Sequence, residues 1–247
     1  MSQTRGVVVR TADIPASRTA DGASVRTLLD TGSGGPGLVR RLVEVAPRTC
    51  LSARAAPAGE VWFVIQGTGQ LAMTGHPSVA LRADRGVLLP PGCAYEASAG
   101  DGLGLRLDIV SFPGTDGHDT TALAPLSRDF GECEIETTGD RQFRVLFGPG
   151  RDCSVATQFV GEIPPGRAPD HSHPYDEVVL ILRGEGIAHI SGVGYPVAAG
   201  TCAHLPPGLV HCLENTGSET MRVLGVFHPA DSPAAKLRSD ALRSSGS

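Results

Sequence analysis

The chain has 247 residues, of which 40% are hydrophobic, 32 are glycine and 19 are proline, and its formal net charge is −5. This composition is typical of a globular protein with many short strands and tight turns, and it argues against a disordered chain. The net negative charge and the absence of a basic cluster exclude nucleic acid as an expected partner.

The lack of recognisable targeting signals and the pattern of cysteines both favour a cytoplasmic location. No apolar run approaches the ~20 residues of a membrane-spanning helix, and the first residues lack the apolar stretch of a signal peptide. The six cysteines fall at irregular spacings without a C-x-x-C motif: Cys50, Cys93, Cys133, Cys153, Cys202 and Cys212. We interpret them as reduced thiols, so we expect a cytoplasmic protein with no membrane contact.

Strand signals dominate the chain from one end to the other. Short apolar or alternating runs, rich in Val, Leu and Ile, are separated by Gly- and Pro-rich turns. These runs occupy 38–46, 61–65, 86–90, 105–110, 155–163, 177–182 and 221–227. Runs of this length and spacing predict an all-β sandwich or barrel.

The two halves of the chain repeat each other. "EVWFVIQGTG" at 60–69 matches "EVVLILRGEG" at 177–186, and "LLPPGCAY" at 88–95 matches "HLPPGLVH" at 204–211. Three further matches occur in the same order, at similar offsets. Repetition of this kind predicts two copies of one β domain, each of about 110 residues. The turn-rich stretch 113–132 is interpreted as the linker.

A cluster of metal-ligating residue types lies in the second copy. In "DHSHPYDE", His171 and His173 are two residues apart, so on an extended strand both side chains point to the same side. Glu177 follows a short turn, and His211 follows the Pro-Pro-Gly turn. Three imidazoles and one carboxylate suit a borderline divalent ion with open coordination positions. The alternative is that the two histidines of this segment are ordinary surface residues at a turn.

At these residues the sequence resembles the cupin family. The first family motif is matched, with one residue fewer than usual after its first glycine, by Gly166, His171, His173, Glu177 and Gly184. The second motif is matched in full by Gly200, Pro206, Gly208, His211 and Asn215. The resemblance implies two tandem antiparallel jelly-roll barrels with the metal inside the second. We expect an N-terminal barrel at 1–116, a linker and entry segment at 117–142, and the metal-binding barrel at 143–247.

The first copy has lost most of the ligand pattern. Arg54, Ala56 and Tyr95 stand at the positions that match the three histidines, and only Glu60 is retained. We therefore expect a metal-free first barrel. Arg54, Glu60 and Tyr95 either line a pocket of their own or belong to a barrel that only supports the second.

Several residues near the second motif are candidates for catalysis or substrate binding. For acid–base chemistry the candidates are Tyr175, His189, His204 and His228. Arg183 and Arg222 could pair with a substrate carboxylate. For each, the competing interpretation is an ordinary turn, strand or solvated residue.

The resemblance implies a mononuclear metal-dependent enzyme acting on a small oxygenated metabolite, with dioxygenase-type oxidation as the leading expectation. The ion would be Fe, Mn, Ni, Cu or Zn, with Fe or Mn favoured. The alternatives are a non-redox isomerase, hydrolase or decarboxylase, and a non-catalytic small-molecule binding or sensor protein. Because only one half carries ligands, a two-site mechanism of the oxalate decarboxylase type is not expected. We expect a monomer or homodimer.

Overall fold

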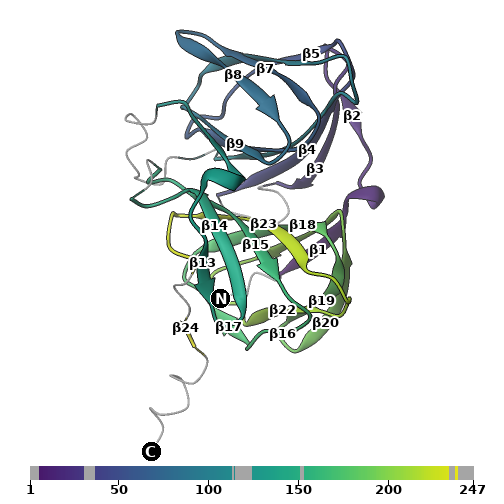
Figure 1. The fold of residues 1–247 in the computed structure, drawn as a ribbon, viewed down its shortest axis with the longest axis vertical. Coiled ribbons are helices and arrows are strands. Elements are labelled where there is room, and N and C mark those ends of the chain that lie inside the picture. The colour runs from purple at the N-terminus through teal and green to yellow at the C-terminus, as the bar shows by residue number, and fades with distance from the viewer. Residues whose placement is uncertain are drawn as a thin grey trace, which may run out of the picture. The chain divides into compact units, whose positions relative to one another are not determined.

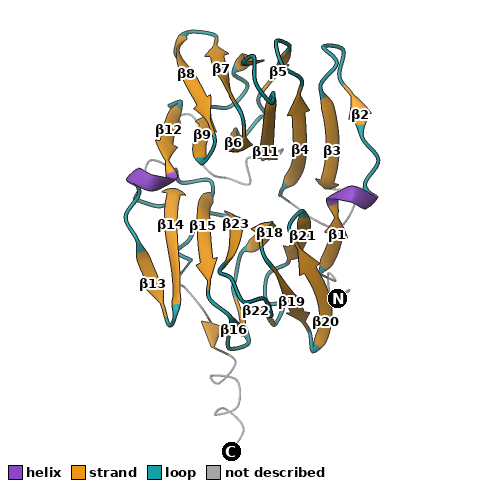
Figure 2. Cartoon of the chain, turned by 45° about the vertical axis from the view of Figure 1, so that its right-hand side comes forward, coloured by secondary structure: helices purple, strands orange, loops and turns teal. Residues whose placement is uncertain are grey.

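The structure is a computed structural model, and it describes residues 6–30, 37–112, 114, 124–150, 153–233 and 237–238. The chain divides into two compact units. The N-terminal unit lies within Thr11–Cys133 and Asp152–Val155, and the C-terminal unit within Met1–Arg10, Glu134–Arg151 and Ala156–Ser247. Strands dominate both units, as the orange ribbons of Figure 2 show. Within the described ranges, no helix is long and apolar enough to cross a membrane.

The N-terminal unit consists of two antiparallel sheets. The larger has the order β12-β9-β6-β11-β4-β3-β2 and the smaller β5-β10-β7-β8. The strands are β2 (Ser17–Arg18), β3 (Ser24–Leu29), β4 (Val39–Val45), β5 (Cys50–Arg54), β6 (Glu60–Gln66), β7 (Thr68–Met73), β8 (His76–Arg82), β9 (Arg85–Leu89), β10 (Ala94–Ala99), β11 (Leu105–Ser111) and β12 (Leu126–Asp129), with the 3-10 turns η1 (Thr11–Asp13) and η3 (Phe130–Glu132).

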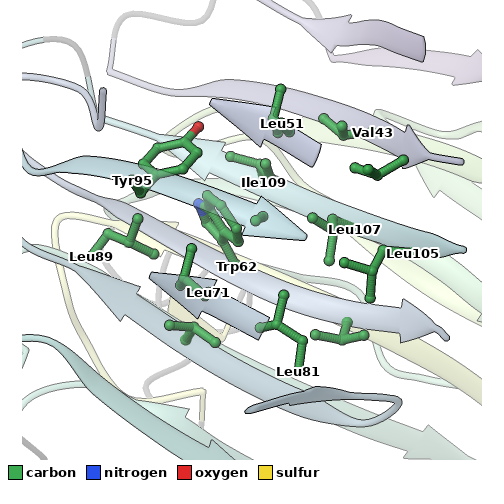
Figure 3. Packing of buried hydrophobic residues seen from close by; sticks show 14 of the residues in the cluster. Val43, Leu51, Trp62, Leu71, Leu81, Leu89, Tyr95, Leu105, Leu107 and Ile109 are labelled. Atoms are coloured by element: carbon green, nitrogen blue, oxygen red, sulfur yellow. The ribbon is translucent and has the colours of Figure 1, made fainter. Parts of the chain in front are cut away.

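The interior of this unit is packed with apolar side chains (Figure 3). Trp62 of β6 is fully buried and meets Tyr95 of β10 edge-on, with ring centroids 4.8 Å apart. Leu71 and Leu107, also fully buried, come from the two different sheets and join the same cluster. Alternation along each strand turns these residues inward, which is why the period-2 pattern of the sequence produces a filled barrel.

The C-terminal unit repeats the arrangement (Figure 1). Its larger sheet has the order β1-β21-β18-β23-β15-β14-β13, and its smaller sheet β20-β19-β22-β17-β24, with β16 also paired to β22. The strands are β1 (Val7–Arg10), β13 (Glu136–Thr138), β14 (Arg141–Phe147), β15 (Thr157–Ile163), β16 (Gly166–Arg167), β17 (His171–Ser172), β18 (Asp176–Arg183), β19 (Glu185–Ile190), β20 (Val193–Ala198), β21 (Thr201–Leu205), β22 (His211–Asn215), β23 (Met221–His228) and β24 (Leu237–Arg238). The all-β class and the two jelly-roll barrels are thereby confirmed.

The units depart from the expected ranges at two edge strands. β1, at the start of the chain, pairs with β21 of the C-terminal unit, with Val7 opposite His204. β12, inside the expected linker, pairs with β9 of the N-terminal unit, with Leu126 opposite Leu88. The C-terminal barrel thus takes an edge strand from the start of the chain, and the N-terminal barrel takes one from the expected linker. An edge strand is defined by its hydrogen-bonding partner, and four residues carry too little pattern to reveal that partner.

Candidate metal centre

Both sheets of the C-terminal unit contribute to the predicted ligand set. His171 begins β17 and lies directly opposite His211, the first residue of β22, in the smaller sheet. Directly opposed residues of an antiparallel pair present their side chains on the same face. Glu177 is the second residue of β18 in the larger sheet, and His173 lies in the connection from β17 to β18. The carboxylate therefore meets the imidazoles between the two sheets.

Three of these side chains form a compact buried cluster. Among the described residues, the donor atoms of His173, Glu177 and His211 lie within 4.8 Å of one another, and all three residues are buried. Oε2 of Glu177 lies 2.9 Å from Nε2 of His173 and 3.8 Å from Nε2 of His211. His171 is outside this group of three, but its ring lies beside that of His211, with centroids 4.5 Å apart.

Backbone carbonyl groups fix the orientation of all three imidazoles. Nδ1 of His173 is 2.8 Å from the carbonyl oxygen of Tyr175, and Nδ1 of His211 is 2.8 Å from that of Leu209. Nδ1 of His171 is 3.2 Å from the carbonyl oxygen of Pro169. Since a carbonyl only accepts, each Nδ1 carries the proton and donates. In a neutral ring the lone pair is then on Nε2, which is the arrangement of metal-ligating histidines.

This donor set fits a divalent cation. A neutral His173 would present its Nε2 lone pair to a carboxylate oxygen at 2.9 Å, so a proton or a cation has to lie between the two acceptors. Cis ligands of an octahedral ion at about 2.1 Å are about 3 Å apart, which matches this separation. Burial opposes ionisation of Glu177, yet a hydrogen bond from protonated His173 and the positive charge of protonated neighbouring imidazoles together hold its pKa below the ordinary value. The carboxylate is thus available as a ligand.

A cavity of about 100 Å³ adjoins the cluster. Its floor contains the four predicted ligands, and its walls are largely aromatic or aliphatic. Three polar residues, Thr138, Arg141 and Gln142, come from the β13–β14 hairpin. The remaining lining residues are Phe143, Phe159, Gly161, Ile163, Tyr175, Val179, Leu205, Leu213, Val223, Phe227 and Pro233.

Tyr175 is the one predicted catalytic candidate that lines this cavity. Its ring stacks on His173, with centroids 4.2 Å apart and an interplanar angle of 8°, and on Phe227 at 4.3 Å. The hydroxyl donates to the carbonyl oxygen of Ser232 at 3.4 Å. Burial, with the charges of Glu177 and Asp231, raises the pKa of Tyr175 well above its usual range. The phenol therefore stays protonated and supports the ring of His173.

The other three histidine candidates are not among the cavity residues. His189 pairs with Glu214, Nε2 to Oε2 at 2.7 Å, and His204 pairs with Asp176 at 2.9 Å. His228 is buried at the end of β23. The neighbours Ala188, Leu205 and Phe227 point into the barrel, so each histidine is one residue out of phase with the inner face.

The two arginines predicted to meet a substrate also lie outside the cavity. Arg183 is exposed at the end of β18, and Arg222 precedes Val223, which lines the cavity. Arg141, absent from the sequence-based candidates, lines the cavity instead. Its signal was the alternation in "RQFRVLF", where Arg141 shares strand parity with the buried residues Phe143 and Val145.

In the corresponding region of the N-terminal unit, the side chains of Glu60 and Arg54 form hydrogen bonds with other residues of that unit. Glu60 is buried and accepts from Trp62 Nε1 at 2.8 Å, from Ser111 Oγ at 2.9 Å and from the amide of Ala56 at 3.3 Å. Burial raises its pKa. Arg54 is exposed and donates to the carbonyl oxygen of Gly92. No second cluster of metal-ligating side chains occurs in the part of the chain that the structure describes.

Comparisons with known proteins agree with this architecture. A family model described as "Cupin domain" matches residues 159–227. The "Oxalate-binding protein" of Thermotoga maritima is 36% identical over 68 residues, which are 27% of this chain and 56% of that protein. The match thus spans about half the length of that curated relative.

Solved structures cover almost the whole chain. A "Glyoxylate Induced Protein" from Pseudomonas aeruginosa superposes with a TM-score of 0.77 at 16% identity, over 92% of this chain and 90% of that chain. The oxalate decarboxylase of Bacillus subtilis, a protein with Mn(II) centres, gives 0.77 at 13% identity, over 95% and 80%. At these identities the two structures show that the fold is shared.

Proposed function

The C-terminal unit of this chain is a cupin domain, and from that premise we propose that it is a mononuclear metal-dependent enzyme acting on a small oxygenated metabolite. The ion would be held by His171, His173, Glu177 and His211. One observation carries the proposal: beside a cavity, His173 and His211, each oriented by a backbone carbonyl, have Nε2 within 4 Å of one buried carboxylate oxygen of Glu177, and the ring of His171 lies next to that of His211.

The residues of the chain have separate roles in this proposal. Iron or manganese would supply a Lewis acid and, with O₂, a redox centre for a chelated substrate. Tyr175 keeps the ring of His173 in place by stacking, and Glu177 supplies the negative charge that offsets the cation. Apolar walls such as Phe159 and Val223 exclude water from the bound substrate.

The lining of the cavity favours oxidation over proton-transfer chemistry. Many isomerases, hydrolases and decarboxylases use a side chain that gives or takes a proton near neutral pH. Among the described lining residues, the titratable groups other than the proposed ligands are Arg141 and Tyr175. Arginine keeps its charge, and the raised pKa of Tyr175 keeps its proton in place. Dioxygenase-type oxidation depends least on such a group, so it is the leading reaction.

A non-catalytic binding protein is the second candidate. The observation that favours it is the 36% identity, over 68 residues, to a protein named for binding oxalate. The same ligand set would then hold an ion that only anchors a small acid.

Oxygen consumption separates the two candidates. Protein reconstituted with Fe²⁺ or Mn²⁺ is mixed with a panel of small 2-oxo and 2-hydroxy acids in an oxygen electrode. An enzyme of the proposed kind consumes O₂ with one class of acid, and His211→Ala abolishes the uptake while His76→Ala, an exposed position in the N-terminal unit, does not. Saturable binding of the acid without turnover in either metal form would favour the binding protein.

A further inference from the structure

An arginine that the proposed metal centre does not use lies at the cavity. Arg141 is the first residue of β14, and its side chain lines the cavity while remaining only 14% exposed. It comes from the hairpin that also brings the polar residues Thr138 and Gln142 to the lining. The remaining wall is largely apolar, so this hairpin places a positive charge beside a hydrophobic space.

The charge of Arg141 is only partly balanced within the protein. Nη2 donates to the carbonyl oxygen of Leu213 at 2.8 Å. Its carboxylate neighbour is Asp140, whose Oδ1 lies 3.9 Å from Nε and whose side chain is 73% exposed. Such an exposed pair contributes little. A guanidinium has five N–H donors in a planar fork, and these two described partners engage few of them. Burial lowers the pKa of Arg141 despite Asp140, as expected for a cation with incomplete compensation.

The position of Arg141 relative to the proposed ion limits which small molecules can contact both at once. Nη2 of Arg141 donates to the backbone carbonyl of Leu213, whose Cα lies about 7 Å along β22 from the Cα of His211. Both of those side chains line the cavity, together with Phe143 and Phe159. A molecule that contacts the ion and Arg141 together therefore needs two polar ends and a short apolar middle.

We infer that the cavity selects a small dicarboxylate, whose oxygen atoms at one end chelate the ion while the carboxylate at the other end forms a bidentate pair with Arg141. Planar, charge-assisted pairs of this kind are the strong hydrogen bonds of carboxylate recognition. The inference rests on the proposed function, because it needs an ion at the histidine cluster. It adds the chemical class of the ligand and the residue that recognises it.

Two acids of equal length test the inference. 2-Oxoglutarate and 2-oxopentanoate share a five-carbon chain and the same chelating end, but the second has a methyl group in place of the distal carboxylate. Calorimetry on the Mn²⁺-loaded protein should show 2-oxoglutarate bound about 10- to 100-fold more tightly, the range for hydrogen bonds to charged groups. Arg141→Gln should remove this preference and leave the affinity for 2-oxopentanoate unchanged. Arg141→Lys should restore part of it.

A matched variant and a separate metal assay distinguish failure of the inference about Arg141 from failure of the proposed metal centre. Arg183→Gln removes the same charge from an exposed position outside the cavity and should retain the full preference. Mn²⁺ binding, followed by the loss of the free-ion EPR signal, should be equal in the wild type and Arg141→Gln. If Mn²⁺ binds normally but the two acids bind equally, or Arg141→Gln keeps the preference, this inference is overturned while the metal centre stands. If the wild type binds no Mn²⁺, the proposed function fails, and the inference fails with it.

Discussion

Nε2 of His173 lies 2.9 Å from Oε2 of Glu177, and both side chains are buried between the two sheets of the C-terminal unit. The other ring nitrogen of His173 donates to the carbonyl oxygen of Tyr175. The imidazole of His173 thus bridges the backbone of the loop between β17 and β18 and the carboxylate of Glu177 near the start of β18. This relationship orients a proposed ligand, as a preorganised metal site would require.

Replacing the carboxylate of Glu177 by an amide should weaken metal binding while leaving the shape of the site unchanged. Glu177→Gln keeps the size of the side chain but removes the negative charge that offsets the cation. We expect Mn²⁺ affinity to fall by at least about 10-fold, the lower range even for lost outer-shell partners. Glu60→Gln, at the matching position of the N-terminal unit, is the control and should leave Mn²⁺ affinity unchanged. Equal losses in both variants would contradict the assignment of the site to one unit.

Two substitutions of Tyr175 should separate its ring from its hydroxyl. Tyr175→Phe keeps the stacking on His173 and removes only the 3.4 Å hydrogen bond to Ser232, so metal affinity and stability should change little. Tyr175→Ala removes the buried ring and should cost about 3–5 kcal/mol of unfolding free energy, by analogy with Phe→Ala. Chemical denaturation and Mn²⁺ titration of both variants provide the measurement. A large loss of metal in Tyr175→Phe would show that the hydroxyl acts at the site.

The buried ion pair of the N-terminal unit offers a test of stability. Arg40 Nε lies 2.7 Å from Oδ1 of Asp108 and Nη2 lies 3.0 Å from Oδ2, with both side chains fully buried. Asp108→Ala leaves a buried guanidinium without its carboxylate, so the free energy of unfolding should fall by about 3–5 kcal/mol. The double variant Arg40→Met/Asp108→Leu should recover much of this loss. Urea denaturation that finds the double variant no more stable than the single one would contradict this explanation.

Acid should selectively weaken the attachment of β12 to β9. Asp129 at the end of β12 accepts from Nε and Nη2 of Arg85 at 2.9 and 2.7 Å, and also from Arg82. The hydrogen bond from Arg85 holds the pKa of Asp129 below its ordinary value. Because the folded-state pKa is depressed, the stabilisation is present above the unfolded value of about 3.9 and is lost as the pH falls through the folded value.

The comparison for Asp129 is made at two pH values. Asp129→Asn should unfold at a lower urea concentration than the wild type at pH 7, and the difference should shrink as the pH approaches 3. Because Asp129 is near the surface, high salt should also reduce the difference between the two proteins. A difference between the two proteins that grows on acidification would contradict the sign of the shift.

Most of the fold, and the gathering of the four candidate ligands at one cavity, could be predicted because both follow from periodic or motif-based patterns. The repeat at 60–69 and 177–186 places β6 and β18 at equivalent positions in sheets of the same strand order. The spacing of His171 and His173 was sufficient to place both rings at one cavity.

The remaining features could not be predicted because they depend on which face of a strand a residue occupies and on which strands pair at the sheet edges. His204 of β21 and Arg222 of β23 lie one residue away from the inner face, and the sequence pattern did not reveal that phase. Arg141 lies on the inner face for the same reason that Phe143 does, yet a charged residue at the start of a strand is usually solvated. The pairing of β1 with β21 and of β12 with β9 depends on hydrogen bonds between segments far apart in the chain, which local patterns do not encode.

The metal content of three purified proteins shows whether the C-terminal unit alone chelates one cation. Elemental analysis should find close to one divalent ion per chain in the wild type and in the double variant Arg54→Ala/Tyr95→Ala. His211→Ala should lose the ion while its far-ultraviolet circular dichroism still shows a β fold. Loss of the ion in the double variant, with retention in His211→Ala, would show that the N-terminal unit holds the ion.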